Sequence, residues 1–315
     1  MIDTAKVAYV FPGQGSQFPG MGRDLYDNFA PARALFQQAD EILKFPLSKL
    51  CFEGPEDELR LTINAQPALV TVSFACLKAI QETDGTGKLP APAFVAGHSL
   101  GEYTALAVAD VIDFAGTVYL ARERGRLMHE AGLKTAGGMA AIIGLDEAVL
   151  TEVCQATNTW IANFNCPGQM VISGSKENIE KAMELAKAKG AARAIPLQVS
   201  GAFHSPLMQP AMEGLAKIIS RLTFKDPSVP VVANTTGQPL VRGEQMRGEL
   251  TAQLLNSVQW QRSIEFMIEN GVSTFAEIGP GKVLTGLIKR INRNANVLNI
   301  GDSEAIRNLA NPIPS

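Results

Sequence analysis

Residues Ala91 to Ala107 read APAFVAGHSLGEYTALA, and this stretch decides the fold of the chain around it. A short apolar run ends in Gly97-His98-Ser99-Leu100-Gly101, and an alanine- and leucine-rich stretch with good helix propensity follows directly. The pattern predicts a strand, a tight turn and a helix. A serine in such a turn can hold its hydroxyl clear of the sheet, so Ser99 is the candidate nucleophile. The alternative is an ordinary glycine turn between strand and helix.

The composition is that of a folded protein with a large core. Of the 315 residues, 46% are hydrophobic and 19% charged, which allows one large domain or a large domain that carries a smaller one. The net charge of −3 does not favour nucleic acid or an anionic membrane as a partner. The N-terminal apolar run is too short for a signal peptide, and we find no uninterrupted apolar stretch of about 18 residues. We therefore expect a soluble, cytoplasmic protein.

The four cysteines are widely spaced and form no C-x-x-C pair. This spacing indicates neither a zinc site nor a disulfide framework, and it fits a reducing compartment. We expect no metal and no cofactor.

A glycine-rich loop follows the predicted buried strand at Lys6 to Phe11 and begins with Pro12-Gly13-Gln14-Gly15-Ser16-Gln17. Phe18 stands where the third glycine of a G-x-G-x-x-G motif belongs, so a nucleotide cradle is not expected. The loop could instead supply backbone N–H groups to a developing oxyanion, or it could be a surface turn.

Two segments with helical spacing carry polar residues of interest. From Asn64 to Glu82, Gln66 could face a site, although a cap or surface amide is the commoner role. From Asp113 to Ala131, with Asp113 as the predicted N-cap, Arg124 falls on the apolar side of the helix and His129 on the solvated side. A buried arginine must be paired, either with a protein carboxylate or with a substrate carboxylate.

Residues Gly137 to Val199 change in character and predict the order β-α-β-β-α-β, which is the ferredoxin-like arrangement. The predicted elements are strands at 137–145, 160–164, 169–173 and 192–199, with helices at 146–156 and 176–189. Its length suits a small subdomain inserted into a larger one. We therefore divide the chain into residues 1–133 with 201–315 and residues 134–200.

His204 is the best candidate base for Ser99 among the three histidines. It precedes Ser205-Pro206, a helix start, and lies on a loop softened by Gly201. The ring of His98 should point away from the turn and serve packing. A loop histidine without a role is the alternative for His204.

The last part of the chain again alternates strand and helix. Strands are predicted at 230–234 and 274–278, and helices at 248–256 and after Gly279-Pro280-Gly281.

Five motifs in this order resemble the malonyl-CoA:acyl carrier protein transacylase family, from about Val7 to Ile291. They are Gly13-Gln14-Gly15-Ser16-Gln17, Gly97-His98-Ser99-Leu100-Gly101-Glu102, Arg124-Gly125-Arg126-Leu127-Met128, Ala202-Phe203-His204 and Glu277-Ile278-Gly279-Pro280-Gly281. The resemblance implies an α/β fold, with an α/β-hydrolase-like large subdomain and an inserted ferredoxin-like subdomain.

The resemblance also implies a role for each matching residue. Ser99 and His204 would form a catalytic dyad, with the backbone carbonyl of Gln253 orienting the histidine in place of an aspartate. The backbone N–H groups of Gln14 and Leu100 would form the oxyanion hole. Arg124 would bind the substrate carboxylate, and Phe203 is the residue that malonyl-selective members carry.

The implied reaction is ping-pong transfer of a malonyl group from malonyl-CoA, through malonyl-Ser99, to the phosphopantetheine thiol of an acyl carrier protein in fatty acid biosynthesis. Three other functions remain open: a trans-acting acyltransferase of a polyketide synthase, an acyl-thioester hydrolase with the same dyad, and a non-catalytic carrier-binding protein. Carrier proteins are usually acidic, so basic residues could dock one, or simply be solvated: Lys187, Lys189, Arg193, Lys289 and Arg290.

Overall fold

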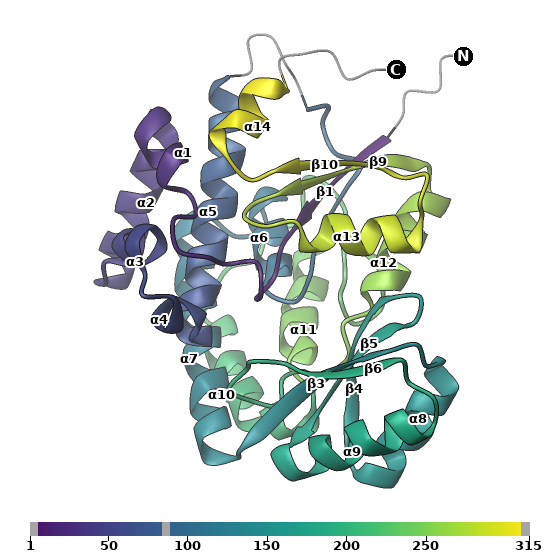
Figure 1. Ribbon diagram of the computed structural model, residues 1–315. Helices are drawn as coiled ribbons and strands as arrows, with labels where there is room; N and C mark the ends of the chain where they lie inside the picture. Colours follow the sequence, from purple (N-terminus) through teal and green to yellow (C-terminus); the bar gives the residue numbers. More distant parts are fainter. Residues whose placement is uncertain (1–5, 84–88, 310–315) are drawn as a thin grey trace.

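A six-stranded sheet forms the centre of the computed structural model, which describes residues 6–83 and 89–309. The strand order is β10-β9-β1-β2-β7-β8, and all neighbours are parallel except β8, which runs antiparallel to β7 (Figure 1). The strands are β1 (Lys6–Phe11), β2 (Phe94–Gly97), β7 (Val231–Val232), β8 (Pro239–Leu240), β9 (Val272–Ile278) and β10 (Asn296–Ile300).

Helices cover both faces of this sheet, and the alternation of side chains along β1 shows why. Val7, Tyr9 and Phe11 belong to one buried cluster, and Ala8 and Val10 to a second. Successive residues of a strand point to opposite faces, so a strand buried on both faces is apolar throughout. The helices are α1 (Arg23–Asn28), α2 (Ala30–Leu43), α3 (Leu47–Glu53), α4 (Glu56–Arg60), α5 (Thr62–Glu82), α6 (Gly101–Val108), α7 (Phe114–Lys134), α10 (Gln209–Ile219), α11 (Gly243–Gln253), α12 (Trp260–Glu269), α13 (Val283–Ile291) and α14 (Ser303–Asn308).

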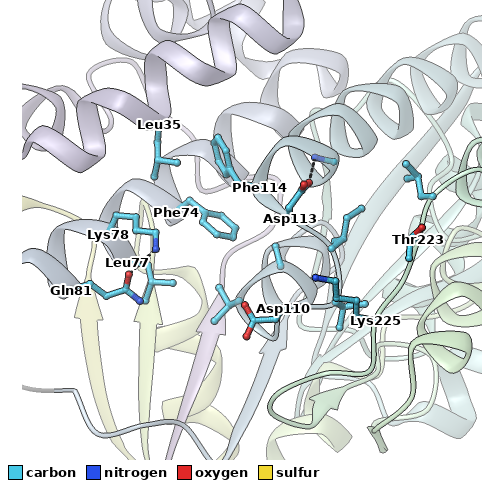
Figure 2. Close-up of a pocket in the computed structure, with 16 residues that line it drawn as sticks. Leu35, Phe74, Leu77, Lys78, Gln81, Asp110, Asp113, Phe114, Thr223 and Lys225 are labelled. Carbon is cyan, nitrogen blue, oxygen red and sulfur yellow. Dashed lines mark hydrogen bonds between the residues drawn. The ribbon is translucent and has the colours of Figure 1, made fainter.

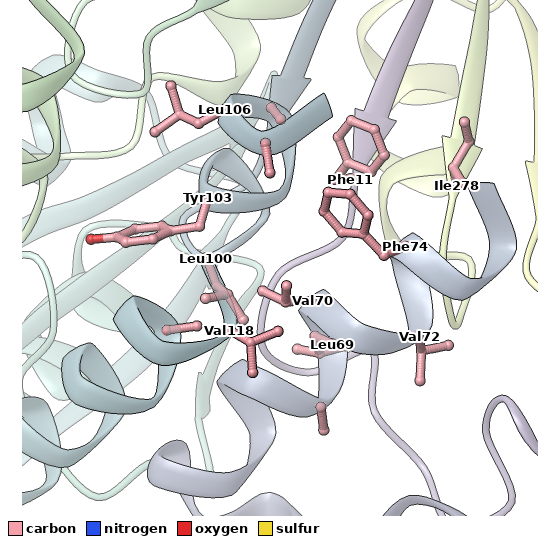
Figure 3. Packing of buried hydrophobic residues seen from close by; sticks show 14 of the residues in the cluster. Phe11, Leu69, Val70, Val72, Phe74, Leu100, Tyr103, Leu106, Val118 and Ile278 are labelled. Carbon is pink, nitrogen blue, oxygen red and sulfur yellow. The ribbon is translucent and has the colours of Figure 1, made fainter. Parts of the chain in front are cut away.

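Helix α5 is the central helix of the larger cluster. Figure 3 shows Leu69 and Val70 of this helix together with Leu100 and Val118 in the same core. Among the described residues, α5 alone is long and apolar enough to cross a membrane, but 89% of its apolar window is buried inside the protein. The core therefore accounts for its apolar character.

The chain from the end of α7 to residue 200 forms a second sheet. Its strand order is β4-β5-β3-β6, and every neighbouring pair is antiparallel. Two helices pack on it, and the chain order β-α-β-β-α-β confirms the predicted ferredoxin-like arrangement (Figure 1). The elements are β3 (Gly137–Ile143), α8 (Glu147–Thr157), β4 (Trp160–Cys166), β5 (Gln169–Ser175), α9 (Lys176–Ala188) and β6 (Arg193–Pro196). The division at 133/134 and 200/201 stays a prediction.

Several element bounds differ from the predicted ones. The strand expected over 230–234 ends at Val232, because Asn234 turns its side chain toward the end of β2 instead of continuing the ladder. Helix α11 begins at Gly243, five residues earlier than predicted, and the backbone N–H of Gly243 donates to Asp226 Oδ1. Helix α12 was not predicted, although its Trp260 and Ile264 are buried.

Candidate active site

Ser99 lies in a strained turn between β2 and α6. Its φ is 49°, in the left-handed region that a non-glycine residue adopts at a cost of about 1–2 kcal/mol. The two flanking glycines make the turn possible. A Cβ on Gly97 would lie 1.9 Å from the carbonyl carbon of Gly101, and one on Gly101 would lie 2.1 Å from the carbonyl oxygen of Phe11. The surrounding structure therefore holds Ser99 in a strained conformation, and the alternative of an ordinary glycine turn does not apply.

Asn234 holds this turn from the segment that follows the neighbouring strand β7. Its Oδ1 accepts the backbone N–H of Ser99 at 2.7 Å, and its Nδ2 donates to the carbonyl of Gly97 at 2.7 Å. The side chain is 1% exposed. The sequence does not predict a role for Asn234, since nothing near it in the chain indicates a partner 135 residues away.

Ser99 and His204 are in direct contact. Ser99 Oγ lies 2.8 Å from His204 Nε2, and His204 Nδ1 lies 2.8 Å from the carbonyl oxygen of Gln253. A carbonyl only accepts, so this contact assigns the proton to Nδ1 and leaves Nε2 free to accept the serine proton. Burial, and then the charge of Arg124, lower the pKa of His204 to about 3. The imidazole is therefore a neutral base at neutral pH.

Arg124 is 1% exposed and reaches the nucleophile from α7. Its Nη1 donates to Gln66 Oε1 at 2.9 Å, and its Nη2 donates to Gln253 Oε1 at 2.8 Å and to Ser99 Oγ at 3.1 Å. Its Cζ lies 5.2 Å from the centre of the Tyr103 ring. These partners are neutral.

No protein carboxylate forms an ion pair with Arg124 in the part of the chain that the structure describes, and the charge of buried Glu102 acts on it only from farther away. None of the ion pairs there includes it, and its Nε is buried without an acceptor. Burial lowers the pKa of the guanidinium, yet arginine stays protonated in proteins. Of the two predicted kinds of partner, the geometry leaves room for an external carboxylate beside Ser99.

Gln66 is part of the site, so the expectation of a cap or surface amide is wrong. The side chain is fully buried in α5, where Oε1 accepts from Arg124 and Nε2 donates to Thr62 Oγ1 at 2.8 Å. The fixed amide makes Gln66 an acceptor for the arginine. A helical wheel shows on which side of α5 Gln66 lies. It does not show that Arg124 of α7 packs against that side.

Gln253 lies behind the dyad, at the end of α11, and its side chain links several groups. Besides accepting from Arg124, it donates from Nε2 to the carbonyl of Ser99 at 2.9 Å and to Glu102 Oε2 at 2.5 Å. Burial raises the pKa of Glu102 well above its usual range, and the charge of Glu249 adds to this, while the donated hydrogen bonds and Arg124 partly offset it.

One cavity of about 430 Å³ joins most of the predicted site residues. Its lining includes Gln14, Ser99, Leu100, Arg124, Phe203 and His204. Gln253 is not part of the lining, which suits a residue that acts on the histidine from behind.

In the ranges 6–83 and 89–309, neither Gln14 nor Leu100 donates its backbone N–H to a protein acceptor. Both donors are therefore available to an oxyanion.

The glycine-rich loop packs directly on the serine turn. A Cβ on Gly13 would lie 2.3 Å from the carbonyl oxygen of His98, so only glycine allows this approach. The side chain of Gln14 is held by Thr62, whose Oγ1 donates to Gln14 Oε1 at 2.9 Å. This packing favours the oxyanion role over a free surface turn.

A second cavity, of about 560 Å³, lies among α5, the α6–α7 junction and residues 222–225. Figure 2 shows an apolar floor that includes Phe74 and Phe114, with Lys78, Asp110 and Lys225 around it. None of the predicted site residues lines this cavity. The chemistry therefore belongs to the cavity at Ser99.

The other two histidines differ in part from expectation. His98 packs edge-on against Trp260 with 5.6 Å between ring centres, and its Nε2 contacts Asn165 Oδ1 at 2.9 Å, but the residue also lines the cavity at Ser99. Burial lowers its pKa. The prediction that His129 is solvated is only half right: the residue is half-buried, and its Nδ1 is enclosed with no hydrogen-bond partner among the described residues.

Comparison with known proteins places this geometry in a family. Residues 8–306 match the family model of the acyl transferase domain. The malonyl CoA-acyl carrier protein transacylase of Bacillus subtilis (strain 168) is 47% identical over 307 residues, which cover 96% of this chain and 95% of that protein.

Solved structures agree over the whole fold. The acyl-carrier-protein S-malonyltransferase of Bartonella henselae shares 43% identity with a TM-score of 0.91, covering 96% of this chain and 97% of that one. A malonyl-transacylase in complex with its holo type II PKS acyl-carrier protein shares 42% identity with a TM-score of 0.92, covering 97% and 99%. The predicted α/β fold class is confirmed, and the chain belongs to the malonyl CoA-acyl carrier protein transacylase family of acyl transferases.

Proposed function

We propose that the chain transfers the malonyl group of malonyl-CoA to the phosphopantetheine thiol of an acyl carrier protein, through a malonyl ester of Ser99. The observation that carries this proposal is the buried cation of Arg124, which lies 3.1 Å from Ser99 Oγ and forms no ion pair with a carboxylate of the described residues. An acyl group that ends in a carboxylate supplies the missing charge, and the guanidinium can bind it with two parallel hydrogen bonds.

Acylation of Ser99 is the first half of the reaction. His204 Nε2 takes the hydroxyl proton, Ser99 Oγ bonds to the thioester carbon, and the C–S bond breaks as the tetrahedral intermediate collapses. The CoA sulfur leaves with the proton from His204. A general base of this kind contributes about 10²–10⁴-fold.

Transfer to the carrier is the second half. The carrier thiol gives its proton to His204 Nε2 and its sulfur bonds to the ester carbon. The C–Oγ bond then breaks, and Ser99 Oγ recovers the proton. In both halves the backbone N–H groups of Gln14 and Leu100 would hold the oxyanion, a contribution of about 10²–10³-fold for one donor.

An acyl-thioester hydrolase would use the same dyad with water as the acceptor. The experiment that separates the two is incubation of the enzyme with malonyl-CoA, with and without holo carrier protein, while free malonate and malonyl carrier are both quantified. The transferase forms malonyl carrier and little malonate. Release of malonate at the same rate with or without carrier would contradict the proposal.

The acceptor could belong to fatty acid or polyketide synthesis. The malonyl-transacylase solved with a type II PKS acyl-carrier protein is 42% identical, so the polyketide alternative has a specific observation in its favour. Rates with one fatty acid carrier and one polyketide carrier decide between them.

Localisation and docking stay predictions, as does the absence of a cofactor. A cytoplasmic site of action fits the substrates proposed here. All five residues suggested for carrier docking are exposed. Three of them have partners within the chain: Lys189 pairs with Glu152, Lys289 donates to the carbonyl of Ala295, and Arg290 donates to Gln169.

A further inference from the structure

We propose that Glu102 is a positioning residue: it fixes the orientation of the Gln253 side-chain amide, and through that amide it holds Arg124 in place for the substrate carboxylate. This inference rests on the proposed function, because it concerns the selectivity of the same site. It adds to Gln253, whose backbone carbonyl contacts His204, a second task for the side chain.

Glu102 lies three residues after the nucleophile, in the first turn of α6, and is 1% exposed. Its Oε1 accepts the backbone N–H of Asn234 at 2.8 Å, and its Oε2 accepts Gln253 Nε2 at 2.5 Å. Both oxygens of the carboxyl group are therefore acceptors for fixed donors. Burying a carboxyl group without such partners costs free energy of folding, so a buried carboxyl group beside the active site indicates a specific role.

The amide of Gln253 works in one orientation only. As placed, Nε2 donates to Glu102 and to the carbonyl of Ser99, while Oε1 accepts from Arg124 Nη2. A half-turn about the last side-chain bond would bring the amide N–H groups against the arginine N–H groups, and the amide oxygen against two other oxygens. All three hydrogen bonds would be lost.

In its ionised form Glu102 makes this orientation unambiguous, because both of its oxygens are then acceptors and face the N–H donors of Gln253 and Asn234. A glutamine at position 102 is isosteric but has one oxygen and one NH₂ group. If its oxygen faces Asn234, its NH₂ group faces Gln253 Nε2 and favours the turned amide. If its oxygen faces Gln253, a buried N–H of Asn234 loses its acceptor.

The consequence at Arg124 concerns selectivity. With Gln253 turned, Nη2 faces donors and the guanidinium loses one of the two amide oxygens that hold it, the other being Gln66 Oε1. Two parallel hydrogen bonds to a carboxylate require a fixed guanidinium plane. An acetyl group has no carboxylate, so its transfer to Ser99 does not depend on that plane.

The test is the rate of Ser99 acylation by malonyl-CoA and by acetyl-CoA in Glu102→Gln. We expect the malonyl-to-acetyl ratio to fall about tenfold, in line with an unsatisfied buried hydrogen bond. The control is Glu249→Gln, since Glu249 is also a buried acid but accepts hydrogen bonds from Thr235 and, among the described residues, forms none with Gln253 or Arg124. There the ratio should stay within about twofold of wild type.

A double-mutant cycle shows whether Glu102 acts through the amide. Gln253→Met removes the amide but keeps the backbone carbonyl that contacts His204, and alone it should lower the ratio as Glu102→Gln does. In that background Glu102→Gln should change the ratio less than twofold further. An equal loss of both rates in Glu102→Gln, additive effects on the ratio, or an unchanged ratio in Gln253→Met would each overturn the inference.

The readout also separates this inference from the proposed function. Failure of the proposed function would leave wild-type enzyme without a malonyl adduct. If the inference alone fails, the wild-type enzyme still prefers malonyl-CoA. The variants then lose the malonyl and acetyl rates to the same extent. Gln253→Met keeps the inference testable if Glu102→Gln does not fold.

Discussion

Arg124 Nη2 donates to Ser99 Oγ at 3.1 Å, and the same hydroxyl lies 2.8 Å from His204 Nε2. The arginine that would bind the substrate carboxylate is therefore hydrogen-bonded to the nucleophile itself. A substrate carboxylate would take the place of Ser99 Oγ as an acceptor for Arg124 Nη2. Because the two groups are in contact, a substrate whose carboxylate binds Arg124 also has its thioester carbon close to Ser99 Oγ. In this arrangement, recognition of the acid and alignment for attack are one event.

Arg124→Ala should change selectivity rather than abolish chemistry. We expect acylation by malonyl-CoA to fall about 10²–10³-fold, since removing one partner of a buried charge pair costs about 2–5 kcal/mol. Acylation by acetyl-CoA should stay within about threefold of wild type. The control is Arg126→Ala, which removes a half-exposed arginine paired with Glu123 and Glu130. Equal losses with both substrates would contradict the role of Arg124.

Gln66→Leu should weaken malonyl transfer without disturbing the dyad. It keeps the volume of a fully buried side chain but removes the oxygen that accepts from Arg124 Nη1. We expect about a tenfold lower rate with malonyl-CoA, the cost of one unsatisfied buried donor, and little change with acetyl-CoA. Gln81→Leu, on the exposed end of α5, is the control for the substitution itself. A rate equal to that of the control would remove Gln66 from the site.

The pH profile of acylation should lack the usual histidine limb. Because the pKa of His204 is lowered from 6.5 to about 3, the base stays unprotonated as the pH falls through 6.5. The apparent second-order rate with malonyl-CoA should therefore be flat from about pH 8 to about pH 5. An acidic limb with its midpoint near pH 6.5 would show an ordinary histidine instead.

The same profile in Arg124→Ala, measured with acetyl-CoA, tests the second cause of that shift. Loss of the positive charge removes one effect that lowers the pKa of His204, so the acidic limb should move toward higher pH. Burial, the larger cause, remains, so the midpoint should stay below 6.5. An unmoved limb would show that Arg124 does not act on the base.

Gly101→Ala should destabilise the protein through the serine turn. The new Cβ would lie 2.1 Å from the carbonyl oxygen of Phe11, so β1 or α6 must shift. We expect a loss of about 1–3 kcal/mol in the free energy of unfolding, measured in urea, together with lower activity. Gly248→Ala is the matched control, because no atom lies within 4 Å of its added Cβ and the substitution favours the helix by about 0.4–1 kcal/mol. Equal stability of the two variants would contradict the account of the turn.

The local parts of the fold could be predicted from the sequence. The strand before Ser99 and the helix after it follow from an apolar run, a glycine-flanked turn and helix propensity, all within 17 residues. The β-α-β-β-α-β order likewise follows from patterns within each element. Helix α12 was missed because its apolar positions, among them Trp260 and Ile264, follow a segment with no strong start signal.

The supporting residues of the site could not be predicted in the same way. Asn234 and Glu102 matter through hydrogen bonds to Ser99 and Gln253, across 135 and 151 residues of chain. For Gln66 the sequence left a site role open but favoured a cap or surface amide, because only the packing of α5 on α7 brings Arg124 to it. These contacts depend on tertiary structure, which periodicity and propensity do not contain.

The most direct test of the account is the intact mass of the purified protein after brief mixing with malonyl-CoA, with Ser99→Ala and acetyl-CoA as controls. The account predicts one malonyl adduct on the wild-type protein, none on Ser99→Ala, and loss of the adduct to added holo carrier protein. A wild-type protein that remains unmodified, or a Ser99→Ala protein that carries the same adduct, would contradict the serine mechanism.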